Sequence, residues 1–322
     1  MNAPVTDQVL IKPSPYVNEL SARLRRAVQG EVKFDRGSRA RYATDASIYQ
    51  IEPVGVLVPR TVDDVRAAIA ICRELHVPLL PRGAGTSQCG QTVGAALVID
   101  NSKYLNRVLT LDMEAMTVTV EPGIVLDHLN AWLKPHGVWF PVDVSTAAQC
   151  TLGGMAGNNS CGSRSLPYGN IAHHVVAIDA ILADGSEATF NDESAMLALH
   201  APGTRIGDLV RRLRMIGERE RDEIERRVPK VMRRVGGYNI DVFHPQSELP
   251  YTADGSVNLS HLLVGSEGTL AYTRALTLKL SPLPTQKTLG VVNFPSFYQA
   301  MDSARHLVKL GPAAVELVDR TM

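Results

Sequence analysis

Two glycine-rich segments contain the residue types best suited to binding a phosphorylated ligand. The first, residues 81–90, reads PRGAGTSQCG, and the second, residues 151–162, reads TLGGMAGNNSCG. Glycine adopts positive φ angles and lets a backbone approach a ligand closely, and successive N–H groups in such a turn form a concave anion site. Two segments of this kind in one chain favour a ligand with two ends, which we interpret as a dinucleotide.

The first segment also carries a positive charge and two hydroxyl groups. Arg82 is a candidate partner for a pyrophosphate, and Thr86 and Ser87 are candidate hydrogen-bond donors. The alternative is a tight surface turn without a ligand. The G-x-G pattern of this segment is similar to the Rossmann nucleotide fingerprint, but that mechanism needs a helix N-terminus after the loop. A strand is predicted at 95–100 instead, so the Rossmann interpretation is excluded.

The second segment leaves little side chain between its backbone and a bound molecule. Small residues would let a flat ring system pack closely there, at Gly153, Gly154, Ala156 and Gly157. The alternative is a glycine-rich helix start packed in a core. A third short motif, GSEGTL at 265–270, has a β-bulge or a turn between strands as its alternative. Each motif alone is unspecific, and the prediction depends on their joint order and spacing.

The composition is that of an ordinary globular protein with no sign of a nucleic-acid or membrane partner. Of 322 residues, 45% are hydrophobic and 20% charged, and Lys+Arg and Asp+Glu both number 33. A neutral chain with 5% aromatic residues offers little to nucleic acid. No apolar run approaches the length of a membrane span, and no secretory signal is recognisable. The four cysteines lack metal-ligand spacing, so we expect a reduced, cytoplasmic protein.

Hydrophobic periodicity predicts the elements that would position these segments. Residues 1–30 are expected to form a leader and a short amphipathic helix with Leu20, Leu24 and Val28 on one face. Thr61 is a candidate N-cap for a helix that ends near residue 76. The other elements predicted before the second glycine-rich segment are strands at 54–59, 77–80, 95–100 and 117–121 and a helix at 125–136.

The second half of the chain combines predicted strands with a strongly charged insertion. Residues 195–260 are expected to form a helical insertion with both signs of charge on its surface. The i,i+4 spacing of Asp222 with Arg226 and of Glu223 with Arg227 favours helix there. Strands are predicted at 175–183 and 187–190, joined as a hairpin by Asp184-Gly185, and again at 261–263 and 276–280.

The last residues resemble the opening of another domain. A strand at 287–293, a helix at 295–310 and a strand at 313–318 are predicted. The chain stops directly after the last of these, so we expect a truncated unit with an exposed sheet edge.

Together these motifs resemble the PCMH-type FAD-binding domain, the fold of vanillyl-alcohol oxidase and p-cresol methylhydroxylase. The resemblance covers roughly residues 35–320. The matching motifs are Pro81-Arg-Gly-Ala-Gly-Thr-Ser, Cys150-Thr-Leu-Gly-Gly-Met-Ala-Gly-Asn-Asn, Tyr168-Gly169, the strand 175–185 and Gly265-Ser-Glu-Gly-Thr-Leu-Ala. Within this fold the chain resembles the FAD-linked D-2-hydroxyacid dehydrogenases of the D-lactate, D-2-hydroxyglutarate and glycolate oxidase subunit types. The charged insertion and Arg233-Arg-Val-Gly-Gly-Tyr-Asn resemble large members that carry a C-terminal iron–sulfur region.

The resemblance implies an α+β fold with a two-subdomain FAD-binding domain and the start of an α+β cap domain. Its divisions would be residues 1–50 as leader and helical segment, 51–284 as the FAD-binding domain and 285–322 as the truncated start of the substrate-binding cap. Residues 82–87 would cradle the pyrophosphate of FAD, and the later motifs would line or close over the flavin. The implied contacts are Arg82, Gly83, Ala84, Gly85, Thr86, Ser87, Ser145, Thr146, Thr151, Gly153, Gly154, Ala156, Gly157, Asn158, Tyr168, Gly169, Glu267, Gly268 and Thr269.

The resemblance also implies how FAD is held. Covalently flavinylated relatives have a histidine where this chain has Thr86, so FAD is expected to be bound non-covalently. Cys150 lies near the position where some relatives form a second link, but its flanking pattern differs. The four scattered cysteines cannot hold an iron–sulfur cluster, so a cluster is expected only in a missing C-terminal part.

No catalytic base and no metal ligand is assigned from the sequence. The base and metal-binding histidines of the family lie in a Gly-His-x-Gly-Asp-Gly-Asn type motif, which does not occur in these 322 residues. His173 and His174 form a pair at a predicted strand entry, where a packed or solvent-facing histidine is expected rather than a base.

The implied activity is oxidation of a D-2-hydroxy acid to the 2-oxo acid, with hydride transfer to flavin N5. Expected partners are the small acid and an electron acceptor (a quinone, a cytochrome or an iron–sulfur region), with no nucleic acid and no transmembrane segment. The protein is expected in the cytoplasm, or at a membrane surface through its acceptor. The alternatives are a non-catalytic FAD-binding module and, on the same fold, a sugar or aldonolactone oxidase or the reductase of cell-wall UDP-sugar synthesis. Alone, this chain is expected to bind FAD without turnover.

Overall fold

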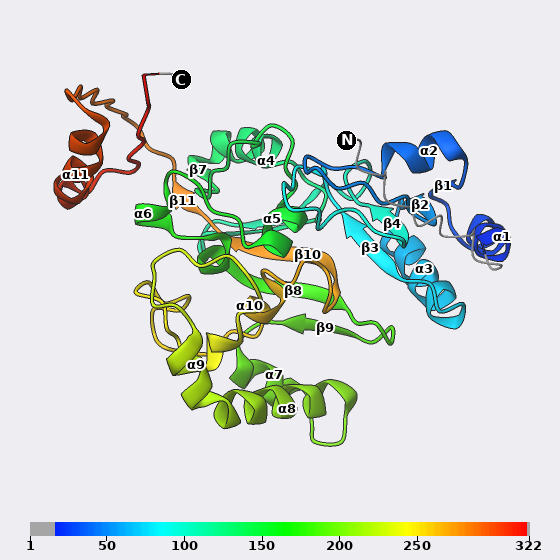
Figure 1. Ribbon diagram of the computed structural model, residues 1–322. Coiled ribbons are helices and arrows are strands. Elements are labelled where there is room, and N and C mark those ends of the chain that lie inside the picture. The colour runs from blue at the N-terminus through cyan, green and yellow to red at the C-terminus, as the bar shows by residue number, and fades with distance from the viewer. Residues whose placement is uncertain (1–16, 321–322) are drawn as a thin grey trace, which may run out of the picture. The chain divides into compact units, whose positions relative to one another are not determined.

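The computed structural model describes residues 17–320 of the chain (Figure 1). They fall into two compact units, of which the first ends at Tyr104 and the second begins at Leu105. The predicted leader lies outside the described residues, and the predicted division at residues 50 and 284 stays a prediction. No helix within 17–320 is both long and apolar enough to cross a membrane.

The first unit is built on a four-stranded sheet with the order β1-β2-β4-β3. β2 (Gly55–Val58), β4 (Leu97–Asp100) and β3 (Leu79–Arg82) are parallel, and β1 (Glu31–Lys33) pairs with β2 in the antiparallel sense. The predicted strand–helix–strand unit is therefore confirmed, with β4 inserted between its two strands. The sheet is buried on both sides of β2 and β4, which fits their continuous apolar runs.

Helices cover this sheet through the apolar stripes expected from the sequence. α3 (Val62–Glu74) begins at a capping box of Thr61 and Asp64 and buries the predicted Val65, Ile69 and Cys72. α1 (Val17–Ala27) packs on α3, and its Leu20 and Leu24 are fully buried. A short helix, α2 (Arg36–Arg41), starts where Asp35 accepts a hydrogen bond from the Ser38 N–H, and periodicity did not predict it.

The second unit contains an entirely antiparallel sheet with the order β5-β6-β10-β8-β9. The long strand β10 (Tyr272–Lys279) lies at its centre, between β6 (Thr117–Val120) and β8 (Val175–Ile181). β8 and β9 (Glu187–Phe190) form the predicted hairpin. β5 (Val108–Asp112) completes the other edge. Three of its five residues are exposed and none is fully buried, which explains why no strong apolar pattern predicted it.

The largest core of the chain lies between this sheet and the helices that follow β6. α4 (Leu126–Leu133) and α5 (Leu152–Asn158) contribute to this core, and the short helix α6 (Ser165–Tyr168) follows them in the chain. Leu129, Leu152 and Leu276 are fully buried in this core. α4 continues as a 3-10 turn, Lys134–His136, and a two-stranded ribbon of β7 (Val138–Trp139) and β11 (Ser281–Pro282) lies beyond it.

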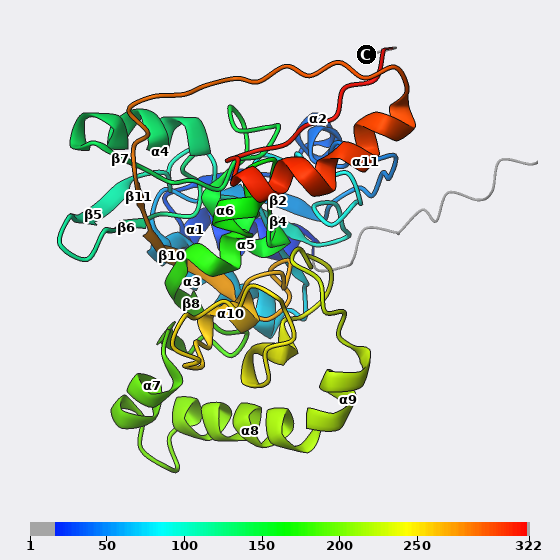
Figure 2. The same cartoon turned by 90° about the vertical axis from the view of Figure 1, so that its left-hand side faces the viewer.

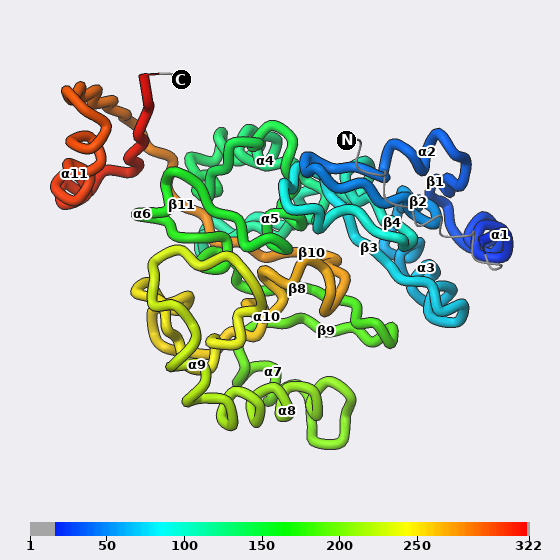
Figure 3. Tube along the Cα trace, viewed as in Figure 1, coloured from blue at the N-terminus to red at the C-terminus, as the bar shows by residue number. Residues whose placement is uncertain are grey.

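The charged insertion is helical only in part. α7 (Glu193–Leu199) and α8 (Arg205–Arg219) contact one another, and α9 (Arg221–Arg227) extends α8 (Figure 2). The predicted Arg227–Glu223 pair is present, with Nε and Oε2 2.9 Å apart. Arg226, which was predicted to pair with Asp222, contacts Glu223. A long connection then runs to α10 (Ser260–Leu263), broken only by the 3-10 turn Ile240–Phe243 (Figure 3).

Three predicted strands are wrong. Residues 261–263 form helix α10 instead, because a short buried apolar run has the same pattern in either element and Asn258 accepts hydrogen bonds from Ser260 at its start. Residues 287–293 and 313–318 are not strands, and no partner strand lies beside them within the described residues. Between them α11 (Phe297–Leu307) forms as predicted but buries no residue.

Candidate cofactor-binding site

In the first unit, residues 82–87 lie at the carboxyl end of the parallel strand β3. Arg82 is the last residue of β3, and residues 83–87 form the loop that begins there. The loop continues to β4 without a helix, which confirms the exclusion of a Rossmann turn. In open sheets with parallel strands, ligands bind outside the carboxyl ends of those strands. The predicted phosphate loop therefore has a suitable place in the fold.

The Arg82 side chain is buried and holds the main chain around this loop. Its Nη1 donates to the carbonyl oxygens of Tyr42 and Thr92, both at 3.1 Å, and its Nη2 donates to that of Thr44 at 2.8 Å. Burial lowers the pKa of the guanidinium, while Asp100 opposes this shift. Arg82 thus has a clear positioning role, and its predicted contact with a pyrophosphate stays a prediction.

Gly85 lies directly against this guanidinium and has a backbone that favours glycine. Its φ is +70°, and a Cβ built there would lie 2.4 Å from Nη2 of Arg82. The Ala46 N–H donates to the Gly85 carbonyl at 3.1 Å. Within residues 17–320, the amide N–H groups of residues 83–86 have no hydrogen-bond acceptor. A loop that leaves successive amides unpaired fits a phosphate ligand.

In the second unit, the second glycine-rich segment folds as α5 and its N-cap. The Thr151 side chain accepts from the Gly154 N–H at 3.4 Å, and residues 124–126 pair with 150–152. The helical alternative considered from the sequence is therefore correct for 152–158. Of the predicted contacts, Gly153, Gly154, Ala156, Gly157 and Asn158 lie on α5, so one short helix brings them together.

The two adjacent glycines of α5, Gly153 and Gly154, differ in how much space a side chain would have at each position. A Cβ on Gly153 would lie 2.6 Å from Pro122 Cβ, and the Gly153 N–H donates to the Pro122 carbonyl at 2.8 Å. Buried Glu121 fixes this turn by accepting from Arg107 Nη2 at 2.8 Å. A Cβ on Gly154 would meet only Thr151 Oγ1 among the described residues outside its own helix. Gly154 and Gly157, whose Cβ would lie 3.7 Å from Glu267 Cα, are therefore less crowded than Gly153.

The third motif caps the C-terminal end of α5. The Gly265 N–H donates to the Ala156 carbonyl at 2.8 Å, and the Glu267 N–H donates to the Gly157 carbonyl at 3.0 Å. Glu267 has a φ of +53°, an uncommon value outside glycine that marks a constrained turn. The structure thus brings the predicted residues of α5 and 267–269 together, although more than a hundred residues separate them in sequence.

Three buried asparagines lock the long connection after α9 to this centre, and the sequence analysis missed them. Asn159 and Asn170 both donate through Nδ2 to the Arg234 carbonyl, at 3.2 and 3.1 Å. Asn239 donates to the carbonyls of His261 and Val264 at 3.0 and 2.9 Å. Asn159 has φ 52° and ψ 49° as the C-cap of α5, so an asparagine after a glycine-rich helix was the available signal.

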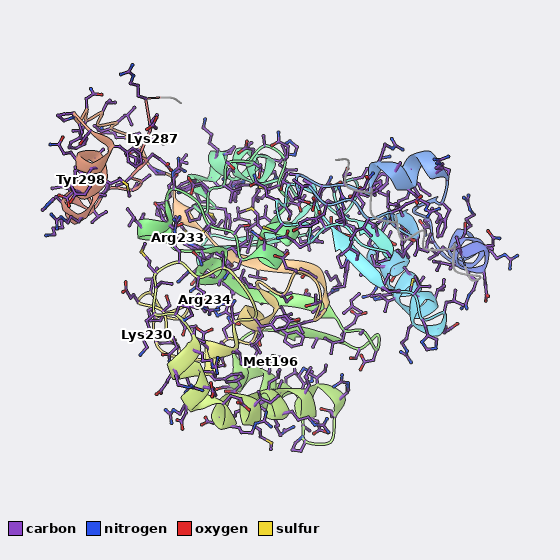
Figure 4. The ribbon with its side chains drawn as sticks, viewed as in Figure 1. Met196, Lys230, Arg233, Arg234, Lys287 and Tyr298 are labelled. Atoms are coloured by element: carbon purple, nitrogen blue, oxygen red, sulfur yellow. The ribbon has the colours of Figure 1, made fainter. Side chains whose placement is uncertain are left out.

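The same connection carries the charged side chains of Lys230, Arg233 and Arg234, which are labelled in Figure 4. Arg234 forms an ion pair with buried Asp241, whereas exposed Arg233 donates from Nη1 to the Gly162 carbonyl at 3.2 Å. Tyr238 and Thr269 share a hydrogen bond of 2.9 Å between their hydroxyl groups. Thr269, a predicted contact, is therefore tied to the connection rather than to α5.

The remaining predicted residues lie at turns on either side of α5. Ser145 and Thr146 belong to the turn before α5, in which the Cys150 N–H donates to the Thr146 carbonyl at 2.8 Å. Tyr168 ends α6 and packs edge-on against Trp139, with ring centroids 5.7 Å apart. Gly169 follows with a φ of +66°, and a Cβ there would lie 2.5 Å from His173 Nδ1.

Three histidines of this unit, His173, His174 and His261, contact main-chain groups; His174 and His261 are buried and His173 is half-buried. His173 Nδ1 accepts from the Asn170 N–H at 3.0 Å, and its Nε2 lies 3.0 Å from the Leu249 carbonyl. His174 Nε2 and His261 Nε2 lie 2.8 and 3.0 Å from the carbonyls of Tyr168 and Val175. Burial lowers the pKa of His174 and of His261 to about 4. Neutral, buried imidazoles fit packing rather than catalysis, and no metal-binding cluster occurs within 17–320.

Comparison with known proteins identifies the cofactor that this arrangement serves. Residues 53–191 match the family model described as FAD binding domain. This span includes the phosphate loop, α5 and the hairpin strands β8 and β9. Residues 53–191 form an FAD-binding domain. The chain binds FAD through a fold of the PCMH type, and the predicted α+β class is confirmed.

Similarity to individual proteins extends beyond the FAD-binding domain and covers most of the chain. A protein named D-2-hydroxyglutarate dehydrogenase from Pseudomonas putida is 34% identical over 316 residues, 96% of this chain and 31% of its own length. A protein named probable mitochondrial D-lactate dehydrogenase from Danio rerio is 31% identical over 304 residues, 92% of this chain and 50% of its own. This chain thus spans about a third to a half of these relatives.

A solved structure shows the same fold at lower identity. Alkyldihydroxyacetonephosphate synthase matches with a TM-score of 0.64 and 18% identity, over 97% of this chain and 49% of that one. At this identity the match establishes the fold alone.

Replacing Gly85 should abolish FAD retention by the FAD-binding domain. In Gly85→Val, a β-branched side chain at a φ of +70° would displace the Arg82 guanidinium and distort the loop. The measurement is the flavin-to-protein absorbance ratio of purified protein, with circular dichroism to confirm folding. Gly185→Val is the matched control, since Gly185 has a φ of +86° but open space around its Cβ position. Normal flavin content in Gly85→Val would show that the loop is only a turn.

The free energy of unfolding should decrease as the pH is lowered from about 6.5 to about 4, because of two buried histidines. Because the folded pKa of His174 and His261 is about 4 and the unfolded value near 6.5, their stabilisation is complete above pH 6.5 and is lost as pH falls towards 4. The loss is about 3 kcal/mol for each histidine. His174→Gln should remove about half of it in urea unfolding series from pH 7 to 4, whereas exposed His128→Gln should not. An unchanged profile for His174→Gln would contradict this assignment.

Proposed function

We propose that this chain is the FAD-binding part of an enzyme that oxidises a D-2-hydroxy acid to the corresponding 2-oxo acid. The observation that carries the proposal is the 34% identity over 96% of the chain with a protein named D-2-hydroxyglutarate dehydrogenase. The probable D-lactate dehydrogenase supports the same substrate class. Because the chain covers 31% and 50% of these relatives, their activities are carried over to it only as a proposal.

The role proposed for this chain is to bind and orient the cofactor. In the first unit, the amides of residues 83–86 and the hydroxyls of Thr86 and Ser87 would hold the pyrophosphate of FAD. In the second unit, the less crowded face of α5 at Gly154 and the turns around it would lie against the flavin and ribityl arm. These turns hold Ser145, Thr146, Thr151, Tyr168, Gly169, Glu267, Gly268 and Thr269. Bound FAD supplies the two-electron acceptor of the reaction.

The proton of the substrate hydroxyl requires a base, and we propose that it lies outside residues 17–320. His174 and His261 each place Nε2 on a main-chain carbonyl, and His173 places both ring nitrogens on main-chain groups. Burial lowers the pKa of all three and limits their access to a substrate. We also propose an electron acceptor (a quinone, a cytochrome or an iron–sulfur region) and a cytoplasmic location. Both proposals rest on the substrate class and on the resemblance. Under this proposal, residues 17–320 bind the cofactor, and a residue outside them accepts the proton.

FAD should leave the polypeptide when the protein is denatured. Thr86 stands at the position of the linking histidine, and the Cys150 thiol is 5% exposed, with its pKa raised to about 11 by burial. Such a thiol is a poor nucleophile for a flavin link. The test is to precipitate the yellow protein with acid and to measure flavin absorbance in the supernatant. Flavin that stays with the precipitate, and is lost from it in Cys150→Ser, would contradict non-covalent binding.

Substrate class is tested by anaerobic titration of the longer protein of which this chain would be a part. D-lactate, D-2-hydroxyglutarate and glycolate are added separately, with L-lactate as the control for chirality. Bleaching of the flavin band near 450 nm by a D-2-hydroxy acid alone is expected. These 322 residues should bind FAD in the same assay but show no turnover with an artificial acceptor. Turnover by these 322 residues at a rate comparable to that of the longer protein would place the base within this chain. If none of the acids bleaches the flavin of the longer protein, the proposed function is wrong.

A further inference from the structure

The connection after α9 carries a segment, residues 233–239, that is fixed at both ends beside α5. The Arg234 carbonyl accepts from two buried asparagine side chains, at 3.2 and 3.1 Å, and one of these belongs to the C-cap of α5. At the other end, Asn239 donates to two carbonyls of α10 and its C-cap, at 3.0 and 2.9 Å. Residues 235–238 between these anchors are exposed. The segment is therefore an anchored stretch that presents its side chains to solvent next to the predicted flavin site.

The two adjacent arginines of this segment have different environments. Arg234 forms an ion pair with buried Asp241. Arg233 is exposed, and its Nη1 donates to the Gly162 carbonyl at 3.2 Å. Gly162 is the last residue of the second glycine-rich segment, so this contact places the Arg233 guanidinium at one end of the segment that we assign to the flavin. Within residues 17–320, no carboxylate forms an ion pair with Arg233.

The acidic side chain beside this contact already has other partners. A Cβ on Gly162 would lie 2.5 Å from Asp143 Oδ1, so Asp143 lies close to the Arg233 contact. Asp143 Oδ2 accepts from Ser163 Oγ at 2.6 Å, and its Oδ1 accepts from the Arg164 N–H at 3.1 Å. The Arg164 side chain balances the carboxylate charge, with its Nε 3.8 Å from Asp143 Oδ2. One positive charge, that of Arg233, is therefore left in excess at this place.

Arg233 lies beside the predicted flavin contacts and is not one of them. Its hydrogen bond goes to Gly162, which follows the last residue of α5 by four positions, and none goes to the glycines within the helix among the described residues. A 2-hydroxy acid must place C2, with the carboxylate attached to it, against the flavin. A cation next to that place suits a group further along the same substrate.

We propose that Arg233 recognises a second carboxylate of the substrate, distal to the reacting carbon, and so makes the site selective for dicarboxylic 2-hydroxy acids. The proposal rests on the proposed function, because it assigns a specificity-determining residue to the same site. The planar guanidinium fork matches a carboxylate in a bidentate contact, and only one of its donors is used on Gly162. The anchors of the segment at Arg234 and Asn239 hold this cation in place before a substrate binds.

The experiment measures binding of two acids that cannot be oxidised at C2 to the FAD-loaded longer protein, by calorimetry at fixed ionic strength. Glutarate carries a carboxylate at each end, and pentanoate has the same carbon chain with one carboxylate. Arg233→Gln should weaken glutarate binding at least about ten-fold, because a charge-assisted contact is lost, and should change pentanoate binding less than about two-fold. Arg233→Lys should recover part of the glutarate affinity.

Lys230→Gln is the matched control. Lys230 is exposed on the same connection, carries the same charge and has no hydrogen bond or ion pair within residues 17–320 (Figure 4). Its replacement should change glutarate binding less than about two-fold. The flavin content of Arg233→Gln should equal that of the unmodified protein, which shows that the glycine-rich segment keeps its shape.

Four results would overturn the proposal. They are no glutarate binding by the unmodified protein, equal weakening of glutarate by Arg233→Gln and Lys230→Gln, equal weakening of glutarate and pentanoate by Arg233→Gln, and loss of FAD from Arg233→Gln. The last result would mean that Arg233 only supports the glycine-rich segment.

Steady-state kinetics of the longer protein separate this proposal from the proposed function. In Arg233→Gln, KM for D-2-hydroxyglutarate should rise at least about ten-fold with little change in kcat, and KM for D-lactate should stay the same. An equal rise for both acids would contradict recognition of a distal carboxylate while the proposed oxidation stands. If no hydroxy acid reduces the flavin, the proposed function is wrong, but glutarate binding that depends on Arg233 would still identify a dicarboxylate site.

Discussion

Hydrogen bonds to main-chain carbonyls hold the glycine-rich segment of each unit in shape. Glycine-rich segments have few side chains with which to fix themselves, so donors from elsewhere do so. In the first unit the Arg82 fork joins three carbonyls from two segments around the phosphate loop. In the second, Asn159 and Asn170 donate to the Arg234 carbonyl, and Asn239 donates to the carbonyls of His261 and Val264. Because a buried carbonyl without a donor is costly, each anchor stabilises its loop strongly.

The anchored elements present backbone rather than side chains to a ligand. Gly85 is needed because a side chain would collide with Arg82, and Gly153 because it would collide with Pro122. Gly154 has no such neighbour and leaves its face of α5 less crowded. Glycine thus serves packing at two positions and access at a third, although the sequence shows the same letter. A flavin or a phosphate can approach only where the fold has not already used the space.

The electrostatics of the described residues suit cofactor binding better than proton transfer. Buried charges such as Glu121 and Asp241 are paired with Arg107 and Arg234, and the buried histidines stay neutral. A carboxylate paired with arginine is a weak base, and an imidazole buried away from solvent has poor access to a substrate. This distribution agrees with a chain that holds FAD and that covers only part of the length of its dehydrogenase relatives.

The sequence by itself determined the local elements and the cofactor class. The capped helix from Thr61, the hairpin at Asp184-Gly185 and the helix at 297–307 follow from short-range patterns, and the glycine motifs carry the resemblance to FAD-binding domains. Only the tertiary structure decided which glycines pack and which stay open, and that Arg82 bonds carbonyls. It also turned 261–263 into a helix. These outcomes depend on contacts between residues far apart in sequence, which periodicity and spacing do not encode.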